Sequence, residues 1–291
     1  MNTHEGYMKR ALELARRGWG RTNPNPLVGA VIVKDGDIIA EGYHEKLGGV
    51  HAEVSAFNNA RQDVDGGTLY VNLEPCSHYG RTAPCARAII EKGIKEVVVA
   101  MVDPNPKVAG RGIQMLRDAG IRVVVGIMEE EARKLNEIFI KYITKKRPFV
   151  IMKAAMTLDG KIASVQGDSK WISGEASRGY VHLIRDRVAA VMVGINTILI
   201  DNPSLTTRLS SGKGKDCARV IVDPRGEIPL DSRVINIDSP AGVILATTSL
   251  LDKGKERLLL DKGVRIVKAE GYEGRVDLAK LMDELYKLVI D

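Results

Sequence analysis

The feature that most constrains the fold is an ordered set of metal-binding residue types in the first third of the chain. His51 and Glu53 lie two positions apart, and Cys76 and Cys85 each follow a proline. These side chains can act together only if the intervening residues fold back on themselves. Residues 68–73 are typical of a buried strand that ends just before Cys76. Helical patterns that begin at His51 and at Cys85 would point two helix N-termini at the same place.

One imidazole, two thiols and a carboxylate are the groups that a zinc-dependent deaminase requires. Three protein ligands hold the metal and leave one position for water, whose pKa the metal lowers toward neutrality. The carboxylate stays off the metal and carries protons to the substrate ring and the departing amine. We therefore predict His51, Cys76 and Cys85 as zinc ligands and Glu53 as the catalytic proton carrier, with His51 at the helix entrance.

The alternative interpretation is a set of ordinary core residues or a closed structural zinc site. Single histidines and cysteines are usually structural, but this ordered set is much less expected by chance. His44 and His78 could each supply a fourth ligand, which would make the zinc structural. The two cysteines lie nine positions apart, which departs from the usual P-C-x-x-C spacing.

Composition restricts the class of partner. A chain of 291 residues can hold two domains with full cores. Its net charge of +6 is spread along the chain, which suits a small phosphorylated substrate better than a nucleic acid, although a solvated surface explains it equally well. A deaminase acting on RNA is a rival function, but it would need an aromatic-lined groove, and aromatic residues make up only 4% of the chain.

Cysteine usage and hydropathy favour a cytoplasmic protein. The third cysteine, Cys217, has no expected partner, so the sequence does not indicate a disulfide scaffold. The first residues contain no apolar stretch typical of a signal peptide. No apolar run approaches the roughly 20 residues that cross a bilayer. We expect neither a membrane nor a nucleic acid as a partner.

Strand and helix patterns alternate along the first half. They predict a layered α/β domain whose sheet is covered on both sides. The segment Gly110–Arg111–Gly112 lacks the third glycine of a nucleotide-binding loop. The expected helices cover residues 7–15, 112–119 and 129–143, and the expected strands cover residues 27–33, 38–41, 96–101 and 121–126.

A charged segment that ends in a proline, residues 145–148, marks a domain boundary near residue 146. The two domains are therefore expected at residues 1–146 and 147–291. No G-x-G-x-x-G follows a strand in the second half, so a Rossmann dinucleotide fingerprint is absent. The pattern there predicts a strand at 149–152, a helix at 175–187, a buried strand at 190–194, further strands at 219–222, 243–246 and 264–267, and a helix at 277–288.

Three motifs in the first half resemble the bifunctional deaminase/reductase family of riboflavin biosynthesis. They are T-N-P-N-P-L-V-G at 22–29, H-A-E at 51–53 and E-P-C-S-H-Y-G-R-T-A-P-C at 74–85. The resemblance implies a cytidine-deaminase-like three-layer α/β/α domain. It also implies zinc-dependent deamination of 2,5-diamino-6-(5-phosphoribosylamino)pyrimidin-4-one to 5-amino-6-(5-phosphoribosylamino)uracil. Asn25, which local chemistry alone would leave in a plain loop, becomes a substrate-binding residue on the same grounds.

Three motifs in the second half, at 155–161, 169–173 and 197–208, resemble the reductase half of the same family. That half is similar in fold to dihydrofolate reductase and uses NADPH to reduce the ribose to a ribityl chain. Planar guanidinium groups suit a sugar phosphate. Without the resemblance, Arg185 could equally be a surface ion-pair residue and Trp171 a core aromatic. The resemblance implies NADPH contacts at Met156, Trp171, Thr197 and Asp201, and substrate contacts at Ser169, Arg185, Leu205 and Arg208.

The resemblance also implies features beyond single residues. Family members continue past the equivalent of Asp291, so we expect the reductase domain to lack its C-terminal part, in a fragment or a degenerate domain. A homo-oligomer is expected on family grounds. The alternatives are a zinc deaminase with an inactive reductase half and a non-catalytic protein with a structural zinc.

Overall fold

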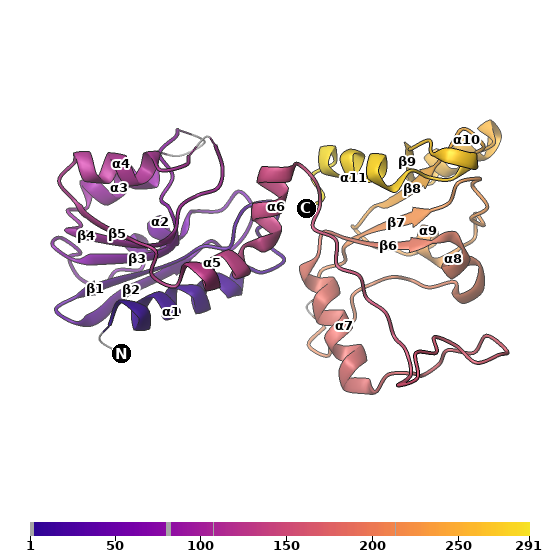
Figure 1. Ribbon diagram of the computed structural model, residues 1–291, viewed down its shortest axis with the longest axis horizontal. Helices are drawn as coiled ribbons and strands as arrows, with labels where there is room; N and C mark the ends of the chain where they lie inside the picture. Colours follow the sequence, from indigo (N-terminus) through magenta and orange to yellow (C-terminus); the bar gives the residue numbers. More distant parts are fainter. Residues whose placement is uncertain (1–2, 80–82, 107, 213) are drawn as a thin grey trace. The chain divides into compact units, whose positions relative to one another are not determined.

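The computed structural model describes residues 3–79, 83–106, 108–212 and 214–291. The chain forms two compact units, Met1–Arg147 and Pro148–Asp291. Figure 1 shows that each unit has its own sheet and its own covering helices.

The first unit is built on a five-stranded mixed sheet. Strand β1 (Gly29–Lys34) pairs antiparallel with both β2 (Asp37–Tyr43) and β3 (Thr68–Leu73), whereas β3, β4 (Glu96–Met101) and β5 (Arg122–Val125) run parallel. A hairpin joins the first two strands, and its turn residues Asp35 and Gly36 have positive φ angles of 53° and 86°. An Asp-Gly pair adopts this conformation readily. The strands are ordered β2, β1, β3, β4 and β5.

Helices cover both faces of this sheet, as the alternating pattern predicts (Figure 1). One face carries α1 (His4–Ala15), which continues into the short 3-10 helix η1 (Arg16–Gly18), and α5 (Glu129–Leu135). The other face carries α2 (Ala52–Asn58), α3 (Cys85–Glu91) and α4 (Arg111–Asp118). Because β3 ends on the side where α2 and α3 begin, the zinc-ligand candidates belong to one edge of this layer.

The prediction of a single helix over residues 129–143 is wrong. The structure has two helices, α5 and α6 (Glu137–Lys145), which are separated at Asn136. The side chain of Asn136 is only 2% exposed, and its amide accepts the Leu27 N–H at 2.8 Å and donates to the Leu27 carbonyl at 3.0 Å. Asn72 donates to the same carbonyl at 2.9 Å. Helical periodicity contains no information about these long-range bonds, so the break could not be predicted from it.

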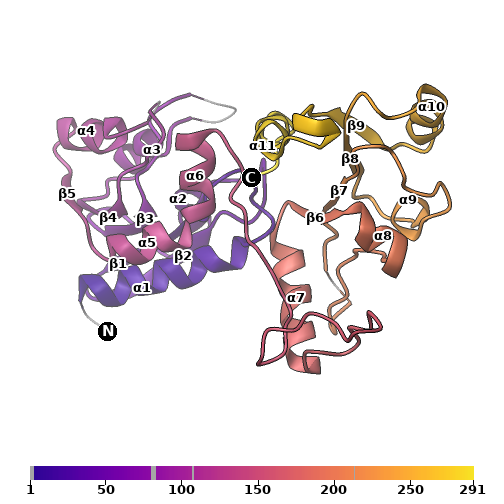
Figure 2. The same cartoon turned by 45° about the vertical axis from the view of Figure 1, so that its right-hand side comes forward.

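The second unit contains a four-stranded parallel sheet, ordered β6 (Ala190–Gly194), β7 (Ala218–Val222), β8 (Val243–Thr247) and β9 (Arg265–Lys268). Helix α7 (Glu175–Arg187) precedes β6, and α11 (Leu278–Lys287) packs on one face of the sheet (Figure 2). The opposite face is covered by α8 (Ile195–Asp201), α9 (Arg233–Asn236) and α10 (Lys253–Asp261). The short 3-10 helix η2 (Tyr272–Gly274) follows β9.

Two expectations for this unit need correction. Residues 149–152 do not form a strand, and Val150, Ile151 and Met152 are exposed, because no strand of the described residues pairs with them. Strand β6 is half-exposed rather than buried, because it lies at the edge of the sheet with β7 as its partner. Apolar composition alone does not distinguish an edge strand from a central one.

In the parts of the chain that the structure describes, none of the helices is long and apolar enough to span a membrane.

The break at Asn136 generates a stability prediction. Replacing Asn136 with Ala leaves the buried Leu27 N–H without an acceptor, whereas the Leu27 carbonyl keeps Asn72. We expect the free energy of unfolding to fall by about 1–3 kcal/mol, measured by urea denaturation. Asn59 is an exposed asparagine whose amide donates to the Glu41 carbonyl. Asn59→Ala should cost at most about 0.5 kcal/mol, and equal losses in the two variants would contradict this account.

Candidate active site

The three predicted zinc ligands come from the ends of three elements. His51 is the N-cap of α2, with extended backbone angles of −71° and 159°, which agrees with its expected place at the helix entrance. Cys85 is the first residue of α3, directly after Pro84. Cys76 follows the end of β3, and its carbonyl accepts the Ala86 N–H at 3.1 Å. These backbone positions bring one imidazole and two thiols to the same edge of the sheet.

The donor atoms of these residues have the geometry of a metal site. The Nδ1 atom of His51 lies 3.2 Å from the Cys85 sulfur and 3.6 Å from the Cys76 sulfur. All three ligand atoms lie within 4.8 Å of one another. Tetrahedral zinc, with bonds of roughly 2.0 Å to nitrogen and 2.3 Å to sulfur, separates such ligands by about 3.6 Å. The donor set therefore fits zinc, with Cys85 buried, Cys76 half-buried and His51 exposed.

Charge at the site is concentrated on Cys76. A hydrogen bond from the Cys85 thiol, together with one from His51, lowers the pKa of Cys76 to about 4. The Cys85 N–H also donates to the Cys76 sulfur at 3.3 Å, from the first turn of α3. The hydrogen bond between the Cys85 thiol and Cys76, together with burial, raises the pKa of Cys85. Cys76 therefore has the character of a thiolate, the form in which a cysteine binds a metal cation.

Glu53 lies in the first turn of α2 and is only 3% exposed. Burial raises its pKa to about 7, and the negative charge of Cys76 adds to the rise. Its carboxylate is not part of the three-residue cluster of donor atoms. A carboxyl group with this pKa can both accept and release a proton near neutral pH, which is the property that a general acid–base requires.

Neither histidine considered as a fourth ligand belongs to the cluster. His44 is buried, its Nδ1 lies 2.9 Å from the Val50 carbonyl, and its Nε2 lies 3.3 Å from the amide nitrogen of Asn25. Burial lowers the pKa of His44, so the neutral ring donates from Nδ1 and accepts at Nε2. Its ring centroid is 5.8 Å from that of His51. His44 therefore connects Asn25 to the metal-ligand cluster, a role that the sequence analysis missed.

His78 is exposed and also lies outside the cluster. Gly80, Arg81 and Thr82, which belong to the family motif quoted above, lie outside the described residues.

In the second unit, the structure brings Arg185 and Arg208 together around one segment. Arg185 donates to the Thr206 carbonyl at 3.2 Å, and Arg208 donates to the Thr206 hydroxyl at 2.9 Å. His182 accepts the Arg208 N–H at 3.1 Å. Burial and the neighbouring Arg208 lower the pKa of Arg185. No ion pair with a carboxylate is found for either arginine among the described residues, so an anion would be favoured here.

The other residues predicted for the second unit are more dispersed. Trp171 is 71% exposed and stacks against the guanidinium of Arg178 at 4.4 Å, so it is not a core aromatic. Thr197 and Asp201 lie one turn apart on α8, directly after the C-terminal end of β6. Within the described ranges, no hydrogen bond or ion pair links either of them to the arginines. Met156 and Ser169 are exposed, whereas Leu205 is buried with a φ angle of 53°.

Comparisons with known proteins match both halves. The family described as "Cytidine and deoxycytidylate deaminase zinc-binding region" matches residues 1–101, and the "RibD C-terminal domain" matches residues 148–291. Riboflavin biosynthesis protein RibD of Actinobacillus pleuropneumoniae is 48% identical over 285 residues, which cover 98% of this chain and 75% of that protein. The Aquifex aeolicus protein of the same name is 46% identical over 288 residues, covering 99% and 80%. This chain belongs to the RibD family.

A solved RibD-family structure agrees with this assignment. The Thermotoga maritima protein described as a diaminohydroxyphosphoribosylaminopyrimidine deaminase/5-amino-6-(5-phosphoribosylamino)uracil reductase has a TM-score of 0.87 and 46% identity, covering 99% of this chain and 78% of that chain. The chain is accordingly a bifunctional enzyme of riboflavin biosynthesis, with a cytidine-deaminase-like domain and a reductase domain. Its cofactors are zinc and NADPH. An RNA deaminase and a non-catalytic zinc protein do not fit this family.

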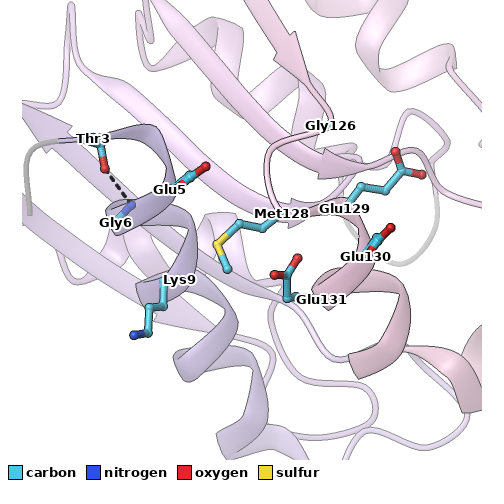
Figure 3. A pocket seen from close by; sticks show the side chains of 9 residues that line it. All are labelled: Thr3, Glu5, Gly6, Lys9, Gly126, Met128, Glu129, Glu130 and Glu131. Carbon is cyan, nitrogen blue, oxygen red and sulfur yellow. Dashed lines mark hydrogen bonds between the residues drawn. The ribbon is translucent and has the colours of Figure 1, made fainter.

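A separate cleft of about 580 Å³ lies between the starts of α1 and α5 in the RibD deaminase unit. Figure 3 shows that glutamates from both helices line it. It contains none of the predicted site residues. Its lining residues are Thr3, Glu5, Gly6, Lys9, Gly126, Met128, Glu129, Glu130 and Glu131.

The ligand geometry predicts which RibD cysteines are needed for zinc. Cys85→Ala removes a sulfur 3.2 Å from the His51 nitrogen, so the purified variant should contain less than a tenth of the zinc of the wild-type chain, measured by elemental analysis. Cys217 is the matched control, because it is also a free buried cysteine but lies outside the cluster. Cys217→Ala should retain full zinc content. Equal zinc in the two variants would exclude Cys85 as a ligand.

Proposed function

We propose that residues 1–146 deaminate 2,5-diamino-6-(5-phosphoribosylamino)pyrimidin-4-one, and that residues 147–291 reduce the ribose of the product to a ribityl chain. The observation that supports this most directly is the open three-ligand donor set of His51, Cys76 and Cys85 beside the buried Glu53. The Thermotoga maritima relative carries both activities in its description.

In the deaminase half, His51, Cys76 and Cys85 would hold zinc, which would act as a Lewis acid and lower the pKa of water at the site. Glu53 takes a proton from this water and gives it to the ring nitrogen of the substrate. After the water oxygen has bonded to the ring carbon, Glu53 carries the remaining proton of that oxygen to the amine, so that the carbon–nitrogen bond breaks and ammonia leaves. Asn25 binds the pyrimidine, and its amide is oriented by the Nε2 acceptor of His44.

In the reductase half, bound NADPH would supply the hydride for reduction of the ring-opened sugar. Met156, Trp171, Thr197 and Asp201 bind this cofactor, and the exposed ring of Trp171 offers it a flat surface. Ser169 and the Leu205 backbone contact the sugar, since the Leu205 side chain is buried in the core. Arg185 and Arg208 bind the phosphate, which supplies the negative charge that their surroundings do not.

We further propose a cytoplasmic homo-oligomer whose partner is a small phosphorylated pyrimidine rather than a nucleic acid. Family resemblance supports the oligomer. The low aromatic content of 4% and the dispersed basic residues support the small substrate.

The role of Glu53 leads to a kinetic prediction. Glu53→Gln preserves the size of the side chain but cannot carry a proton, so the deamination kcat should fall by about 10²–10⁴-fold while zinc content is retained. The measurement is ammonia release from the diamino substrate, with and without NADPH. Glu45→Gln changes an exposed carboxylate of a neighbouring loop and should leave the rate unchanged. Near-normal turnover of Glu53→Gln would remove Glu53 from the mechanism.

The arginine pair leads to a prediction for the second reaction. Arg185→Gln should raise the KM of the deaminated, phosphorylated substrate about 10–100-fold, because a charge-assisted contact to phosphate is lost. Reduction of the dephosphorylated analogue should change much less, since this substrate lacks the charged group. Arg225→Gln alters an exposed arginine of the same unit and serves as the control. An equal loss for both substrates would place Arg185 away from the phosphate.

A further inference from the structure

Glu74 is a buried carboxylate that the reaction does not use. It is only 3% exposed, and both of its oxygens accept hydrogen bonds from backbone N–H groups. Oε2 accepts from Asp103 at 3.1 Å and from Gly110 at 2.9 Å. Oε1 accepts from Gly112 at 2.9 Å and from Ile113 at 3.2 Å. Four donors from the 103–113 segment thus converge on one side chain, two positions before Cys76.

The same segment packs directly against the chain next to Cys76. A Cβ atom on Gly112 would lie 1.9 Å from the Pro75 carbonyl oxygen, so only glycine fits at this point of contact. Gly110 has a φ angle of 84°, which turns the chain into α4. The first turn of α4 is therefore held against the peptide that leads into Cys76.

Cys76 is fixed from both sides. Before it, the Glu74 N–H continues the sheet by donating to the Met101 carbonyl at 3.0 Å, while the Glu74 side chain holds α4. After it, the Ala86 N–H donates to the Cys76 carbonyl and the Cys85 N–H donates to the Cys76 sulfur. The position of this sulfur is thus set by α4 through Glu74 on one side and by α3 on the other.

The Glu74 carboxyl oxygens are hydrogen-bonded by backbone N–H groups rather than paired with a cation. In the described part of the chain, no lysine or arginine forms an ion pair with it, and two of its four donors belong to the first turn of α4. A carboxylate can accept at both oxygens, whereas a glutamine would turn its NH₂ group toward two N–H donors. The site therefore requires an acid and not merely a polar side chain of this size.

We propose that Glu74 is a positioning residue for the metal centre: its carboxylate holds Cys76 in place, so that His51, Cys76 and Cys85 are preorganised for zinc. This inference rests on the proposed ligand set. Glu74 acts through Cys76 and touches neither substrate nor metal. Residues that orient metal ligands typically change metal affinity 10–100-fold when they are replaced.

The test is zinc affinity of the full chain, measured by competition with a chromophoric chelator at a temperature where every variant is folded. Glu74→Gln should raise the zinc dissociation constant about 10–100-fold. The KM for deamination at saturating zinc should stay within about twofold of the wild-type value, because Glu74 does not contact the substrate. Gly110→Ala is a milder variant, since its Cβ meets no atom within 4 Å and only strains the loop. It should weaken zinc binding by a smaller factor.

Leu12→Ala is the matched control for stability. Leu12 is fully buried on α1, on the face of the sheet opposite the zinc helices. This variant should lower the melting temperature of the same unit and leave the zinc dissociation constant unchanged.

Zinc affinity of Glu74→Gln and Gly110→Ala within twofold of wild type would overturn the proposal, as would an equal loss in Leu12→Ala. A wild-type chain that binds no zinc would instead overturn the ligand set itself.

Discussion

The chemistry of the first unit depends on a topological constraint. One strand must end, and two helices must begin, at the same edge of the sheet. Strand β3 delivers Cys76, α2 begins after His51 and α3 begins at Cys85. Each helix start contributes free N–H groups, which stabilise negative charge on sulfur and carboxylate. The arrangement leaves the His51 side exposed while Cys85 and Glu53 are buried. The exposed side of the ligand set therefore lies close to a buried carboxyl group whose pKa is raised to about 7.

Much of this edge could be predicted from the sequence, because its signals are local. The apolar pattern of residues 68–73 predicts β3, and Pro84 indicates the start of α3. The spacing of His51 and Glu53 places them at the entrance and in the first turn of α2. The roles of Asn136 and Glu74 were not predicted, since both depend on backbone groups that are distant in the sequence. Their local sequence contains no sign of those partners.

The second unit shows a different limit of sequence reasoning. Its strands and helices follow local patterns well, yet residues 149–152 have a strand composition without a partner strand among the described residues. The partners of the Arg185 side chain could not be predicted from local patterns either. Without the family resemblance, Arg185 could equally have been a surface ion-pair residue, whereas the structure places its guanidinium on the Thr206 carbonyl. Which polar neighbour a side chain contacts is a tertiary property, and helical spacing contains no information about it.

The double anchor on Leu27 has a consequence for recognition. The Leu27 carbonyl accepts hydrogen bonds from Asn72 on β3 and from Asn136 between α5 and α6. The turn that carries Asn25 is therefore hydrogen-bonded at its end to both the sheet and a helix layer of the domain. A turn held in this way has little conformational freedom left to lose when a ligand arrives. Folding has already ordered this turn, so ligand binding would not have to order it again. A small molecule would therefore bind to a preformed turn rather than to a flexible loop.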